Sequence, residues 1–245
     1  MGEQTGISWT DHTFNPWWGC VKVSPACAHC YAETFSKRVG LKVWGQNSER
    51  RFFGPKHWAE PLKWNAKAAK DGVRRRVFCA SMADVFEDRG DLVTPRADLF
   101  LTIEETPHLD WLLLTKRPEN IRRLLPSWYK GTPWPNVWLG TTVENQQYAD
   151  ERIPHLLSVP AVVRFLSVEP MLGPVDLQRF LPWRFDTYDS PERLDWVIAG
   201  GESGAKYRLS QPEWFRSLRD HCVAAGVKFH FKQWGGMQDG AFLDN

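Results

Sequence analysis

Six short apolar runs recur along the chain, and each ends in small, polar or charged residues. The runs cover residues 77–82, 111–116, 137–142, 162–167, 196–201 and 227–232. They are rich in β-branched and aromatic residues, and several are continuously apolar, as expected of strands buried on both faces of a sheet. A seventh, shorter strand is expected within residues 7–14.

Segments with helical character lie between these runs. They cover residues 28–39, 94–105, 118–125, 145–157 and 211–225. Pro95 stands in the first turn of the second segment, where proline is tolerated, and Pro154 is expected to kink or end the fourth. Strands that alternate with helices predict βαβ units and a parallel sheet.

Polar and charged side chains follow the carboxyl ends of the predicted strands. They include Asp84, Lys116, Arg117, Thr142, Glu144, Ser167, Glu169, Glu202, Ser203 and Gln233. In a barrel these ends converge on one face, whereas in an open sheet only those near a switch point line a crevice. The pattern therefore favours the α/β class, with a partial or full parallel β/α barrel of six or seven strands.

We expect one barrel domain over residues 1–245. Two long segments, residues 42–72 and 182–194, interrupt the rhythm and are interpreted as loops packed on the barrel. The first of them is equally open to interpretation as a lid.

Composition and charge exclude some partners and leave others open. The chain has 245 residues, 31 of them basic and 29 acidic, and a net charge of +2, which does not by itself indicate a nucleic acid or a membrane. No apolar run approaches the roughly 20 residues of a membrane span, and the first ten residues do not resemble a signal peptide. A reducing cytoplasm is therefore expected. The 14 tryptophans either pack under loops or stack in part on a base or another planar ligand.

Three of the five cysteines fall within eleven residues, after the first predicted strand. Cys20, Cys27 and Cys30 have the spacing C-x6-C-x2-C. In a reducing compartment such clusters bind metals or do chemistry more often than they form disulfides. Three thiolates can hold three irons of a [4Fe–4S] cluster and leave the fourth iron open to a ligand.

Two alternatives to an iron–sulfur cluster stay open. A structural zinc site needs a fourth ligand, which His12, His29 or Cys79 can supply. The three cysteines can also be ordinary buried residues, which is the expectation for Cys79, inside a strand, and for Cys222, on a helix face.

The cysteine arrangement resembles the radical S-adenosylmethionine enzymes, whose loop after the first barrel strand usually reads C-x3-C-x2-C. Here the first spacing is six, and His29 stands where those enzymes usually have an aromatic residue. The whole chain is also similar to the phage Gp37/Gp68-like family, known as DUF5131. The matching segments are residues 7–20, 115–118, 140–145, 167–174, 200–204 and 231–235.

The resemblance implies that Cys20, Cys27 and Cys30 ligate a [4Fe–4S] cluster whose open iron binds S-adenosylmethionine. One-electron cleavage then gives a 5′-deoxyadenosyl radical that attacks an unknown substrate, with a nucleotide or a nucleic acid among the candidates and an electron-donor protein as a further partner. The candidate cofactor-binding residues are His29, Ser81, Asp84, Thr142, Ser167, Gly200, Gly201 and Glu202. The candidate catalytic residues are Glu144, Glu169 and Lys116. A zinc-stabilised nucleic-acid-binding protein and a non-radical barrel enzyme are the alternatives.

Overall fold

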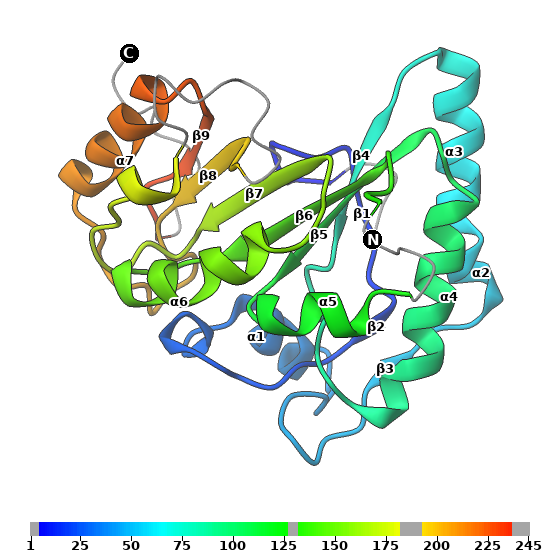
Figure 1. The fold of residues 1–245 in the computed structure, drawn as a ribbon. Helices are drawn as coiled ribbons and strands as arrows, with labels where there is room; N and C mark the ends of the chain where they lie inside the picture. The colour runs from blue at the N-terminus through cyan, green and yellow to red at the C-terminus, as the bar shows by residue number, and fades with distance from the viewer. Residues whose placement is uncertain (1–4, 127–131, 182–192, 237–245) are drawn as a thin grey trace.

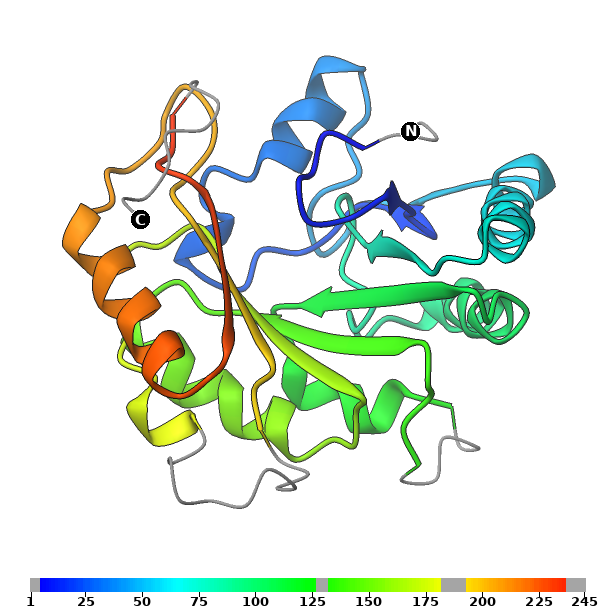
Figure 2. The ribbon, with the colours of Figure 1, turned by 90° about the horizontal axis from the view of Figure 1, so that it is seen from above.

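The computed structural model describes residues 5–126, 132–181 and 193–236. Seven parallel strands form one curled half-barrel sheet in the order β1-β4-β5-β6-β7-β8-β9 (Figures 1 and 2). Their bounds are β1 His12–Thr13, β4 Arg75–Cys79, β5 Leu109–Thr115, β6 Val137–Thr142, β7 Val163–Val168, β8 Trp196–Gly200 and β9 Lys228–Gln233. The expected partial barrel of six to seven strands is thereby confirmed.

Helices alternate with the strands along the chain, and those from residue 60 onward cover the outer face of the sheet. Their bounds are α1 Tyr31–Arg38, α2 Pro55–Trp58, α3 Glu60–Asp71, α4 Val93–Glu104, α5 Ile121–Leu124, α6 Gln146–Leu157 and α7 Pro212–Ala224. Asn145 caps α6, because its side chain accepts a hydrogen bond from the backbone N–H of Tyr148. Pro154 lies inside α6 and does not end it.

Alternate residues of the inner strands, β4 to β8, are buried on opposite faces of the sheet. Val77 and Leu113 belong to the large core beneath the outer helices. Phe78 and Leu112, which pair across β4 and β5, belong to a second cluster on the inner face, where Trp9 packs against Phe78. Burial on both faces explains why the strands read as continuous apolar runs.

The structure differs from the sequence prediction in the first fifth of the chain. Only β1 of the expected first strand joins the sheet, and β2 (Trp17–Trp18) pairs instead with β3 (Arg51–Phe52) in a separate antiparallel ribbon. Helices α2 and α3 occupy much of residues 42–72, which were predicted to be a loop. Residues 182–192 of the second predicted loop lie outside the described residues.

Helix α3 is an integral part of the core. Trp64 and Ala68, one turn apart, are both buried, and the Trp64 ring stacks on His12 of β1 at 4.4 Å. Because α3 connects β1 to β4, it is the crossover helix that a parallel pair of strands requires. In the part of the chain that the structure describes, no helix is both long enough and apolar enough to cross a bilayer.

Candidate active site

The carboxyl ends of the strands surround a cavity of about 570 Å³. The cysteine loop, residues 20–30, forms one side of it, and all three cysteines line the wall. The other predicted site residues on the wall are His29, Ser81, Asp84, Lys116, Thr142, Ser167, Glu169 and Glu202. The fold therefore brings most of the candidate residues together, as expected of parallel strands whose ends meet at one mouth.

Gly19 fixes the entry of the chain into the cysteine loop. Its backbone φ is +117°, and its N–H donates to the carbonyl oxygen of Met82 at 2.9 Å. A Cβ atom at this position would lie 2.3 Å from the carbonyl oxygen of Val43. Only glycine fits both the positive φ and this close approach, so Gly19 determines where Cys20 begins.

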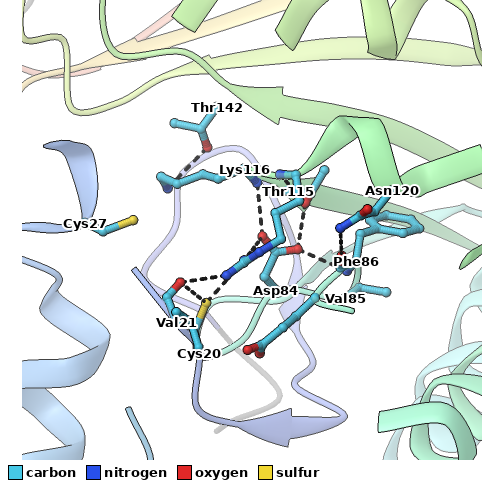
Figure 3. Close-up of polar contacts among 12 residues, drawn as sticks. Cys20, Val21, Cys27, Asp84, Val85, Phe86, Thr115, Lys116, Asn120 and Thr142 are labelled. Carbon is cyan, nitrogen blue, oxygen red and sulfur yellow. Dashed lines mark hydrogen bonds and ion pairs between the residues drawn. The ribbon is translucent and has the colours of Figure 1, made fainter. Parts of the chain in front are cut away.

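Cys20 lies beside a buried ion pair (Figure 3). Its Sγ is 3.6 Å from an N–H of Arg117, which pairs with Asp84 at 2.8 Å. Burial, with the nearby Asp84 charge, raises the pKa of the Cys20 thiol to about 12, although Arg117 works in the opposite direction. The Cys20 thiol is therefore protonated at neutral pH.

Asp84 joins the ends of two neighbouring strands. Its carboxylate accepts hydrogen bonds from the Thr115 hydroxyl at 2.6 Å, from the Lys116 N–H at 3.1 Å and from the Phe86 N–H at 3.0 Å (Figure 3). Most of its acceptor capacity is thus used within the protein. Asp84 lines the cavity, and its contacts are those of a residue that supports Arg117.

Glu202 forms a second charged group on the wall. Its carboxylate accepts from the N–H and Nε of Arg208 at 2.8 Å and 2.9 Å, and lies 3.1 Å from Nδ1 of His29. Burial works to raise the pKa of Glu202, but the hydrogen bonds from Arg208 and His29 outweigh it and hold that pKa below its usual value. Glu202 is therefore ionised at neutral pH.

Two lysines bring positive charge to the same cavity. Lys232 of β9 pairs with Glu169 at 2.5 Å, and Nζ of Lys116 lies 3.4 Å from the Thr142 hydroxyl. Ser81 is held from two sides: its hydroxyl accepts from Asn15 at 3.1 Å, and its carbonyl accepts from the Tyr31 hydroxyl at 3.0 Å.

Three of the predicted residues do not line the cavity. Glu144 is fully buried, pairs with Arg152 at 2.9 Å and accepts from the Ala26 N–H at 3.3 Å. Gly200 packs against the Glu169 carboxylate, and Gly201 packs against the backbone of Trp234. All three contact residues of the protein and do not line the cavity.

Several partners were missed at the level of sequence. Arg152, Arg208 and Lys232 each pair with a predicted acid, but they come from a helix, a loop and the last strand. No sequence spacing relates these partners to one another. Arg117 was not missed, because it directly follows Lys116 among the strand-end residues that the sequence analysis named.

The donor set of the loop fits an iron–sulfur cluster. The thiols of Cys20, Cys27 and Cys30 are free and partly exposed on one cavity, and three thiol donors are the ligands that such clusters take. Among the described residues, no three His, Cys, Asp or Glu side chains are grouped as ligands of one metal ion. Cys79 and Cys222 are buried in the core, as predicted.

The curled half-barrel of parallel strands is similar to the fold of spore photoproduct lyase, a radical S-adenosylmethionine enzyme. One solved mutant of that enzyme matches with a TM-score of 0.54 at 12% identity, and covers 91% of this chain and 76% of that chain. A second mutant matches with a TM-score of 0.52 at 12% identity. The chain belongs to the DUF5131 family of proteins of unknown function, whose family model matches residues 4–243. No curated protein matches the chain.

Proposed function

We propose that this protein is a radical S-adenosylmethionine enzyme in which Cys20, Cys27 and Cys30 ligate a [4Fe–4S] cluster. The observation that supports this most strongly is that three free thiols of one loop line the cavity at the mouth of a half-barrel. With S-adenosylmethionine and an electron from a donor protein, the cluster would supply a carbon radical that takes a hydrogen atom from the substrate.

The protein's own side chains suit the parts of S-adenosylmethionine. Glu169 offers carboxylate oxygens to the methionine ammonium, and Lys116 offers a cation to the methionine carboxylate or to a phosphate of the substrate. Glu202 is a candidate contact for the substrate or for the adenine. The hydroxyl groups available to a ribose are those of Ser81, Thr142 and Ser167. Lys232 pairs with Glu169 and orients its carboxylate.

Glu144 takes a different role in this proposal. Because it is buried and bonded to both Arg152 and Ala26, it acts on the cysteine loop and does not touch a bound substrate. The substrate is not specified by these residues. A nucleotide or a nucleic acid stays among the candidates, since the half-buried Trp44 lines the cavity and its ring can stack on a base. A single domain working in a reducing cytoplasm is consistent with the free thiols.

Anaerobic purification and reconstitution test the proposal. We expect about four irons and four sulfides per chain, and reductant-dependent conversion of S-adenosylmethionine to 5′-deoxyadenosine. Cys27→Ala should lose the cluster, while Cys222→Ala, which removes a thiol on the buried face of α7, should keep it. A colourless protein that holds one tightly bound zinc ion would contradict the proposal and favour a zinc-stabilised protein.

A further inference from the structure

The segment between Cys20 and Cys27, residues 21–26, is held at three points by three ion pairs. Arg117, paired with Asp84, donates to the carbonyl oxygen of Val21 at 2.7 Å. This is the same guanidinium that reaches Cys20 Sγ (Figure 3). The first ion pair therefore contacts both the first cysteine and the residue that follows it.

The second ion pair contacts the other end of the segment. Glu144 pairs with Arg152 at 2.9 Å, and the side chains of both are almost completely buried. The free oxygen of the Glu144 carboxylate accepts from the N–H of Ala26 at 3.3 Å, immediately before Cys27.

The third ion pair contacts the residue next to it. Arg208 donates to the carbonyl oxygen of Pro25 at 3.0 Å while it pairs with Glu202. Glu202 also contacts His29, between the last two cysteines. Three separate stretches of chain thus place a charged group against residues 21–26.

The three ion pairs share one architectural origin. Arg117, Glu144 and Glu202 each stand two positions after the last residue of a strand, β5, β6 and β8 respectively. Parallel strands place these positions on one rim, directly beneath the loop. An isolated buried ion pair contributes little to stability, because desolvation offsets the attraction between the charges. Each pair makes a further hydrogen bond to the loop, and this contact can fix the position of the loop even where the ion pair adds little to the stability of the fold.

We infer that Arg117, Glu144 and Arg208 are positioning residues that hold residues 21–26 in one conformation before any metal is bound. The inference deepens the proposed function and rests on it only for the identity of the group that the loop receives. It predicts that loss of any one contact opens the loop without unfolding the sheet.

Limited trypsin digestion of the metal-free, reduced protein tests the inference directly. Lys22 lies within the segment and is exposed, so cleavage after it reports opening of the loop backbone. Cleavage after Arg164, inside the buried strand β7, reports global unfolding. The quantity to compare, by mass spectrometry, is the ratio of the two cleavage rates.

The informative variants keep size or charge and remove one loop contact each. Arg117→Lys and Arg208→Lys keep the positive charge but lose the forked guanidinium. Glu144→Gln has one acceptor oxygen where the carboxylate has two, so it cannot serve both Ala26 and Arg152. Asp110→Asn is the matched control, since Asp110 pairs with Arg74 at 2.6 Å at the opposite end of the sheet.

In each of the three loop variants we expect the Lys22 to Arg164 cleavage ratio to rise by about tenfold or more, because a hydrogen bond to a charged group is lost. The ratio should stay unchanged in Asp110→Asn. An unchanged ratio in the loop variants would overturn the inference, because it would mean that the ion pairs only stabilise the whole fold.

Iron loading separates this inference from the proposed function. If the wild-type chain takes up no iron but the ratio rises in the variants, the positioning role stands and the proposed cluster fails. If the wild-type chain takes up iron and the ratio does not rise, the positioning role alone fails. Where both hold, the variants should also take up iron more slowly than the wild type and than Asp110→Asn.

Discussion

At Gly201, the addition of a single methyl group should destabilise the fold strongly. It follows β8, and its N–H donates to the Gln233 carbonyl at 2.9 Å. A Cβ atom built on Gly201 would lie 1.8 Å from the carbonyl oxygen of Trp234 and 2.5 Å from its carbonyl carbon. Because both contacts are to backbone, no side-chain rotation relieves them, and Gly201→Ala must push two adjoining segments apart.

The size of the effect follows from the distance. A carbon and an oxygen in van der Waals contact are more than an ångström further apart than this, so the backbone of the neighbouring segment has to move by about that distance. Overpacking of this kind costs about 3 kcal/mol, at the upper end of the usual range. For a chain of this size, that lowers the thermal midpoint by about 6–12 °C.

Gly200 provides the matched control, because the same substitution one residue earlier meets only ordinary contacts. Its Cβ would lie 3.4 Å from the Glu169 carboxyl carbon. Circular dichroism melts should therefore show Gly200→Ala within about 2 °C of the wild type and Gly201→Ala well below both. Equal midpoints for the two variants would refute the reasoning.

Three further predictions concern packing and pH. Trp64→Ala should lower the free energy of unfolding by about 3–5 kcal/mol, measured by urea denaturation, because it empties the buried face of α3. Gly140→Ala should cost about 1–3 kcal/mol in the same assay, since its Cβ would lie 2.4 Å from the Phe165 ring, and adding Phe165→Leu should restore part of the loss. Glu202→Gln should be less stable than the wild type at pH 7. Because the pKa of Glu202 is lowered in the folded state, its contribution is lost as pH falls through that lowered pKa, so the difference in unfolding free energy should narrow in urea melts below pH 4.5.

The strands could be predicted well because both faces of the sheet are buried. Residues 137–142 were predicted as a strand, and β6 has these same bounds. Inner residues such as Phe78 and outer residues such as Val77 are equally apolar, so the run is unbroken and its ends are clear. The change from apolar to polar residues at each strand end then identified most of the residues that line the cavity.

Helix α3 could not be predicted in the same way, because its sequence is dominated by its exposed face. Only Trp64 and Ala68 carry the apolar repeat through the middle of the helix, and charged residues surround them. Pro61 in the first turn resembles a loop signal, although proline is well tolerated there. The contact that defines this helix, Trp64 against His12, joins residues far apart in the chain.

The partners of the site acids were beyond prediction for a related reason. Glu144 follows a strand, as an acid that faces the mouth would, but Arg152 on the inward face of α6 draws it into the interior. The choice between the two positions depends on the packing of α6 against the strand end. The spacing of residues in the sequence does not reveal how α6 packs, so it could not predict the position of Glu144.

Contacts from charged residues can offset the cost of ordering the six-residue segment between Cys20 and Cys27. Three more residues than the usual spacing in the enzymes that the loop resembles add about 3–6 kcal/mol of backbone ordering, at roughly 1–2 kcal/mol each. Three hydrogen bonds that involve charged groups contribute about 1.5–3 kcal/mol each, which is enough to offset that cost. The contacts fall on Val21, Pro25 and Ala26, within the segment whose length departs from the usual pattern. The three contacts therefore fall where the longer spacing adds backbone that has to be ordered, as the positioning role inferred for these residues requires.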